Sequence, residues 1–224
     1  MLDTAVPIPL EATRDTLEAS ILFYRESVVL TTHGRDGVGT TRMVGALDVA
    51  KALAGAISLD TGILPLDTLW WASTSPAPTV GLWRSPRKWK VALQVKALES
   101  PERLEIPMPG LVFVCSPGQP PYVYAAKRRP FSPEEKLYHA PLFNVFSSGL
   151  TCAGNHKYPA RVEEIPESFF LSFFTQAGDS QERSASHPHD LAAWWRELAT
   201  RGRFPTQDLV ACGTIGDVIN GRRH

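Results

Sequence analysis

The sequence has 224 residues, with 23 basic and 23 acidic side chains, so its formal net charge is zero. Hydrophobic residues make up 43% of the chain and charged residues 21%, which is typical of a folded globular protein and excludes a disordered one. Nucleic acids and anionic membranes both attract a basic excess, so neither is an expected partner of a neutral chain. Proteins and small molecules are the expected partners.

No apolar run approaches the length that crosses a bilayer. The segment 1–10 contains Asp3 and lacks the basic start of a secretory signal, which predicts a cytoplasmic protein. The three cysteines, Cys115, Cys152 and Cys212, are widely spaced and form neither a CxxC pair nor a zinc pattern. In a reducing cytoplasm we expect three free thiols and no bound metal.

Hydrophobic periodicity predicts the elements of the first half of the chain. Residues 19–32 predict two short strands around Arg25-Glu26, and residues 41–58 predict a helix because apolar side chains recur at three- and four-residue steps. Successive strands without intervening helices favour an antiparallel meander, whose last two strands form a hairpin. The four strand-like segments, separated by Pro- and Gly-rich breaks, are 69–74, 88–96, 110–116 and 122–127.

The later part of the chain changes in character. Prolines, glycines and polar residues interrupt every apolar run from 128 to 159, which predicts a long loop of the kind that is often functional. Two helices are expected after it, at 165–175 and 187–201. The order of elements predicts an α+β fold. It has an N-terminal hairpin and helix extension at 1–60, and a larger domain with C-terminal helices at 61–224, expected to be one compact unit.

The chemically informative segment is 138–159, YHAPLFNVFSSGLTCAGNHKYP. Asn144 precedes Cys152 by eight positions and Gly149 precedes it by three. A cysteine in an irregular, glycine-flanked segment is expected to be exposed, so that its thiolate can act as a nucleophile. The other two cysteines lie in apolar segments and are expected to be packed.

This spacing resembles the active-site segment of the ubiquitin-conjugating superfamily, in which an asparagine and a glycine stand at the same intervals before the catalytic cysteine. The match is closer to prokaryotic family D of these enzymes, which includes protein B of the plasmid-borne PRTRC cassettes. One departure is that His139 stands five residues before Asn144 instead of directly before a Pro-Asn pair. The features similar to that branch are Trp70-Trp71, the strand PGLVFV at 109–114 and the segment 137–154.

The resemblance implies a ubiquitin-conjugating-like fold, with an antiparallel β-meander flanked by helices. It also implies that Cys152 carries a ubiquitin-like protein as a thioester, received from a ThiF-like activating enzyme and passed to a protein target. That activating enzyme would use the ATP, so no cofactor is expected on this chain, which has no phosphate-binding glycine loop. Plasmid maintenance and antiphage defence are the two roles that the resemblance leaves open.

Within this site Asn144 has two expected roles. Its amide either stabilises the oxyanion that forms when the thioester is discharged, or bonds loop backbone to hold Cys152 in place. His139 or His156 would lower the pKa of the thiol if either lies close to it, and Gly149 would let backbone approach the reacting carbonyl. Two rival functions remain: a catalytically weak module that binds a ubiquitin-like protein without carrying it, and a cysteine hydrolase that pairs Cys152 with a nearby histidine.

Overall fold

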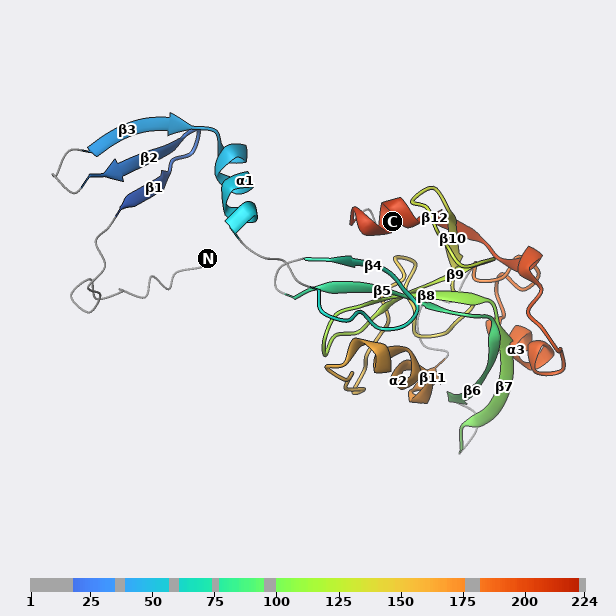
Figure 1. The fold of residues 1–224 in the computed structure, drawn as a ribbon. Coiled ribbons are helices and arrows are strands. Elements are labelled where there is room, and N and C mark those ends of the chain that lie inside the picture. Colours follow the sequence, from blue (N-terminus) through green and yellow to red (C-terminus); the bar gives the residue numbers. More distant parts are fainter. Residues whose placement is uncertain are drawn as a thin grey trace. The chain divides into compact units, whose positions relative to one another are not determined.

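The computed structural model describes residues 18–34, 39–56, 61–73, 77–94, 100–175 and 182–221. The chain divides into two compact units, Met1–Asp60 and Thr61–His224, which are described separately (Figure 1). No helix in the described ranges is long and apolar enough to cross a membrane.

The first unit is a three-stranded antiparallel sheet followed by a helix (Figure 1). The strands predicted on either side of Arg25-Glu26 are confirmed as β1 and β2, which pair with each other. The outer strand β3 also pairs with β2. The elements are β1 (Ala19–Phe23), β2 (Val28–His33), β3 (Gly39–Val44) and α1 (Ala46–Ala56).

The helix predicted at 41–58 is wrong at its start, because residues 41–44 belong to β3. Thr40 and Thr41 pair with β2, where the Thr40 hydroxyl lies 2.7 Å from that of Thr32. Branched side chains and cross-strand threonine pairs favour the strand over the helix at this point. Residues 57 and 58, the end of the predicted helix, lie outside the described residues.

The second unit contains two sheets. Neighbours in the six-stranded sheet are antiparallel and follow the order β12-β10-β9-β8-β5-β4, whereas the three-stranded sheet has the order β11-β6-β7, with β11 parallel to β6. The strands are β4 (Thr68–Ala72), β5 (Thr79–Arg84), β6 (Arg87–Gln94), β7 (Glu102–Met108), β8 (Gly110–Cys115), β9 (Tyr122–Ala126), β10 (Lys136–His139), β11 (Phe173–Thr175) and β12 (Ala211–Thr214). The helices are α2 (Ile165–Leu171), α3 (Leu191–Ala199) and α4 (Ile215–Ile219), with short 3-10 turns at Val162–Glu164 and Thr206–Asp208.

The central strand β8 is buried on both faces. Leu111 and Phe113 face a large hydrophobic cluster to which α2, α3, β6 and β7 contribute, whereas Val112 and Val114 face a smaller cluster that includes α4. Burial on both faces explains why this strand reads as an unbroken apolar run. The tryptophans of β4 pack against the same clusters, Trp71 against the large one and Trp70 against the small one.

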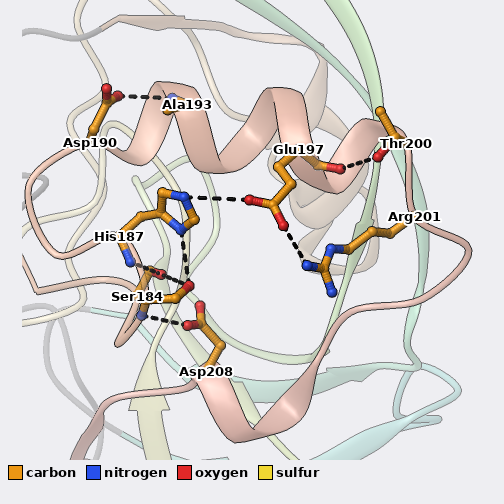
Figure 2. Close-up of polar contacts among 9 residues, drawn as sticks. Ser184, His187, Asp190, Ala193, Glu197, Thr200, Arg201 and Asp208 are labelled. Atoms are coloured by element: carbon orange, nitrogen blue, oxygen red, sulfur yellow. Dashed lines mark hydrogen bonds and ion pairs between the residues drawn. The ribbon is translucent and has the colours of Figure 1, made fainter.

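The predicted α+β fold and the β8–β9 hairpin are confirmed, but the simple meander is not. β6 pairs with β7, the strand that follows it along the chain. It therefore lies in the second sheet instead of between β4 and β8. The loop predicted at 128–159 contains β10, and the helix predicted at 165–175 ends at Leu171 and continues as β11. The helix predicted at 187–201 begins at Leu191, since the Asp190 carboxylate accepts the Ala193 N–H as an N-cap (Figure 2).

Candidate functional site

Cys152 ends a short antiparallel hairpin, residues 144–152, which we call the cysteine hairpin. At its base the Cys152 N–H donates to the Asn144 carbonyl at 2.7 Å. The interval of eight residues between this asparagine and the cysteine is therefore the register of a hairpin, in which each is the other's backbone partner. From base to tip, the pairs are Asn144 with Cys152, Val145 with Thr151, and Phe146 with Leu150.

The tip of the cysteine hairpin turns at Gly149. This residue has φ +85°, and its N–H donates to the Phe146 carbonyl at 2.9 Å, as in a three-residue hairpin loop that ends in a left-handed residue. A Cβ there would come within 2.5 Å of the Tyr124 ring. The Tyr124 hydroxyl in turn donates to the Ser148 carbonyl at 2.6 Å. Gly149 thus shapes the hairpin by letting its tip pack on β9.

The side chain of Asn144 joins the cysteine hairpin to β11. Its Nδ2 donates to the Phe173 carbonyl at 2.8 Å, and its Oδ1 accepts the Thr175 N–H at 3.2 Å and the Thr175 hydroxyl at 3.1 Å. The amide pairs with backbone groups of this strand much as a neighbouring strand would. Asn144 also has φ +59°, a left-handed conformation that asparagine tolerates better than most residues. These contacts favour the holding role, because the bond to Phe173 uses one of the two N–H groups of the amide.

Cys152 is exposed and lines a pocket of about 410 Å³. The pocket lies between the base of the hairpin, the loop after it and the end of α2 with β11. Cys152 and His156 are the titratable residues of this lining, which holds no Asp, Glu, Lys or Arg. Leu171 and Phe173, which are 83% and 60% exposed, give it an apolar rim. The lining residues are Asn144, 152–156, 171–173 and Thr175.

The two candidate histidines lie in different surroundings. His156 lines the pocket, with its Nε2 2.8 Å from the Ser168 hydroxyl of α2 and its ring edge-on to Tyr158 at 4.8 Å. Burial raises the pKa of Tyr158, and the hydrogen bond with the Thr151 hydroxyl offsets part of this rise. His139 is instead half-buried in β10, where its backbone N–H donates to the Val210 carbonyl. The structure therefore brings His156, and not His139, into the lining of the cysteine pocket.

The other two cysteines are packed, as expected. Cys115 is fully buried in β8, and burial raises the pKa of its thiol to about 12. Cys212 is half-buried in β12, and burial likewise raises the pKa of its thiol to about 12. Both stay protonated at neutral pH, so neither supplies a thiolate. In the part of the chain that the structure describes, no three His, Cys, Asp or Glu side chains are grouped to hold a metal ion.

Two residues around the site carry no signal in the sequence. Ser168 contacts His156 from one helix, and Arg183 donates to the Val145 carbonyl from a polar segment near the C-terminus. A serine or an arginine in such a segment is ordinarily a solvated residue. Arg183 could have been recognised as a partner of the hairpin only if the segment 182–186 had been expected to be buried.

An α+β fold that presents an exposed cysteine, with an asparagine eight positions before it, fits the ubiquitin-conjugating-like protein that the spacing resembles. The sequence matches prokaryotic E2 family D over residues 46–212, more than half of the chain, and the protein belongs to that family. The match begins in α1 and ends in β12, so it includes the whole cysteine hairpin and its supports. Neither a curated protein nor a solved structure matches the chain.

Proposed function

We propose that the chain accepts a ubiquitin-like protein on Cys152 as a thioester and transfers it to a protein target. In loading, the thiolate attacks the carbonyl carbon of the thioester held by an activating enzyme. A new C–S bond forms, the old one breaks, and the activating enzyme's thiolate leaves. In discharge, an amine or hydroxyl of the target forms the new bond to the carbonyl carbon, loses its proton, and expels the Cys152 thiolate. Thioester exchange is nearly balanced in energy, so ATP is used only by the activating enzyme.

The observation that carries this proposal is the setting of Cys152. A carrier cysteine must be reached by two different proteins in turn, and an exposed cysteine on a pinned hairpin meets that need. The apolar rim of Leu171 and Phe173 suits a protein surface, since exposed apolar groups beside a polar pocket are typical of docking sites. A free thiol also fits a reducing compartment such as the cytoplasm.

The other site residues support this cysteine in different ways. Asn144 would act as a positioning residue that fixes the base of the hairpin through β11. His156 would take the proton from an incoming amine or hydroxyl through the ring nitrogen that does not contact the Ser168 hydroxyl. His139 would not touch the thioester, since it lies in β10 outside the pocket lining.

A cysteine hydrolase is the second candidate, because His156 and Cys152 line one pocket. A nucleophile–base pair requires the histidine to hydrogen-bond the nucleophile, and the Nε2 of His156 lies instead against Ser168. A binding module would not require an exposed thiol. The carrier therefore fits the contacts better than either rival.

Loading is tested with the cognate activating enzyme, the ubiquitin-like protein and Mg-ATP. The chain should gain the mass of one ubiquitin-like protein, and the adduct should vanish with thiol reductant because a thioester exchanges with added thiol. Cys115→Ser and Cys212→Ser should load normally. Cys152→Ser should load slowly or not at all, and any product should be an oxyester that survives reductant.

Three results would refute the proposal that Cys152 carries the cargo. A reductant-sensitive adduct on Cys152→Ser would place the cargo on another cysteine. Release of free ubiquitin-like protein from a thioester or peptide substrate, without an adduct, would indicate the hydrolase. Tight binding without covalent loading would indicate the binding module.

Deletion of the gene in a plasmid-bearing host under phage challenge separates plasmid maintenance from antiphage defence.

A further inference from the structure

Arg183 lies buried beneath the cysteine hairpin, only 2% exposed. Its Nη2 donates to the Val145 carbonyl at 2.6 Å, and its Nη1 lies 3.3 Å from Nδ1 of His139. A guanidinium can only donate, so that histidine nitrogen is the acceptor. Hydrogen bonds from a charged donor are short and roughly twice as strong as neutral ones. The bond to Val145 is therefore a strong contact to the backbone of the hairpin.

That contact is one rung away from the reactive cysteine. Val145 is bridged to Thr151, and the next rung joins the Asn144 carbonyl to the Cys152 N–H. Movement of the Val145 carbonyl would therefore move the base of the hairpin. Asn144 holds this base on the β11 side, and Arg183 holds it through the backbone carbonyl of the next residue.

The segment that presents Arg183 is itself fixed by buried polar groups, which Figure 2 shows. Ser184 is fully buried and Asp208 is 5% exposed. Together they satisfy the backbone of the tight turn at 184–187, so the direction of the preceding arginine is set by the fold. The bonds are His187 N–H to the Ser184 hydroxyl at 2.9 Å, Ser186 N–H to Asp208 Oδ1 at 2.7 Å, and Ala185 N–H to the Asp208 carbonyl at 3.0 Å.

A second contact from the same part of the chain holds the approach to the hairpin. The indole N–H of Trp195 in α3 donates to the Pro141 carbonyl at 2.9 Å, and its ring packs edge-on against Phe143 at 4.8 Å. α3 thus holds residues 141–143, and Arg183 holds the backbone two residues further on, at Val145. The C-terminal region therefore supports the segment that leads into the site.

We infer that Arg183 is a positioning residue for Cys152. It fixes the cysteine hairpin from below, through the Val145 carbonyl, and the turn at 184–187 holds it in place. Its effect on hairpin order follows from hydrogen bonding alone, whereas its effect on thioester formation rests on the proposed function. Replacing it should loosen the hairpin and slow loading without weakening the docking of the activating enzyme.

The test compares amide hydrogen exchange in three variants with that of the unaltered chain. Arg183→Met should raise exchange at Phe146 and Cys152 on the order of 10-fold or more, because a buried bond to a charged donor is lost, while the amides of β8 stay unchanged. Arg183→Lys should give a smaller increase, since an ammonium can reach the carbonyl but lacks the planar fork. Arg196→Met is the matched control, because that arginine pairs with Glu102 at the surface.

Single-turnover loading gives the second measurement. In Arg183→Met the limiting rate should fall about 10-fold or more, while the concentration of activating enzyme that gives half of this rate stays unchanged. Arg183→Lys should restore part of the rate. Ser184→Ala, which removes an acceptor within the 184–187 turn, should show the same pattern more weakly. If Arg183→Met does not fold, Ser184→Ala and Arg183→Lys together decide whether the inference holds.

Each other outcome overturns the inference. Unchanged exchange in the hairpin would show that Arg183 does not hold it. An equal rise in the hairpin and in β8 would make Arg183 a general structural residue, and looser exchange with an unchanged loading rate would remove its link to Cys152. If the unaltered chain forms no thioester, the proposed function fails while the exchange data still decide whether Arg183 holds the hairpin.

Discussion

Replacing Asn144 with glycine would separate its two roles. Glycine adopts φ +59° without strain, so the change removes the side chain and nothing else at this backbone position. Three hydrogen bonds to Phe173 and Thr175 are lost. At a net value near the lower end of 0.5–1.5 kcal/mol each, the loss is about 2 kcal/mol, or a fall of roughly 4–8 °C in the melting temperature of a domain this size.

The assay measures thermal unfolding, loading and discharge on the same samples. If Asn144 positions the hairpin, loading and discharge should fall in parallel, because both require Cys152 in the same place. Thr175→Val removes one of the three bonds without touching the amide, so it should produce the same parallel loss to a smaller extent. Asn144→Ala should be less stable than Asn144→Gly by about 1 kcal/mol, the cost of a left-handed alanine.

The reasoning fails if discharge alone collapses. Loss of an oxyanion donor costs on the order of 3 kcal/mol, or about 100-fold in rate, and acts only on the step where the oxyanion forms. A discharge defect of that size in Asn144→Gly, with loading and melting temperature unchanged and Thr175→Val fully active, would assign the second N–H of the amide to the oxyanion.

Two further predictions concern local chemistry. Brief maleimide labelling of the native protein should modify Cys152 and spare Cys115 at any pH well below about 12, because burial keeps the latter protonated; modification of Cys115 first would contradict this. Gly149→Ala should lower the free energy of unfolding by about 2–4 kcal/mol, through left-handed strain plus the clash with Tyr124. Gly154→Ala, with φ +51° and open space around it, should lower it by only about 1–2 kcal/mol, and equal melting temperatures of the two variants would contradict the clash.

The sequence predicts the strongly patterned parts of this fold and little of what connects them. β8 and β9 are apolar runs with a Pro-Gly break between them, and their hairpin needs only local information. β7 does alternate, with Leu104, Ile106 and Met108 on the side of the large cluster, but the charged residues and Pro107 between them argue against a strand. β11 has three residues and exists because it pairs with β6, about eighty positions earlier in the chain.

The site divides in the same way. The composition of its segment predicts the exposure of Cys152, and the resemblance in spacing singles out Asn144. The partner of Asn144, by contrast, is the Phe173 carbonyl, a backbone group that leaves no mark in the sequence. His139 and His156 are equivalent in the sequence, and only the fold separates them, since one enters β10 and the other the pocket. Long-range contacts decide roles that residue type alone leaves open.

The register of the cysteine hairpin limits how the chain can change between Asn144 and Cys152. Side chains along a strand alternate between faces, so loss of a single residue from one arm would turn the cysteine to the opposite side of the hairpin. Loss of one residue from each arm would shorten the ladder and leave the two residues opposite each other. With the glycine kept at the turn, a change of two positions would keep the pair opposite each other but would place it on a rung without the Cys152 N–H bond, because hydrogen-bonded and non-hydrogen-bonded pairs alternate along an antiparallel ladder. A relative should therefore keep the interval of eight positions or change it by four.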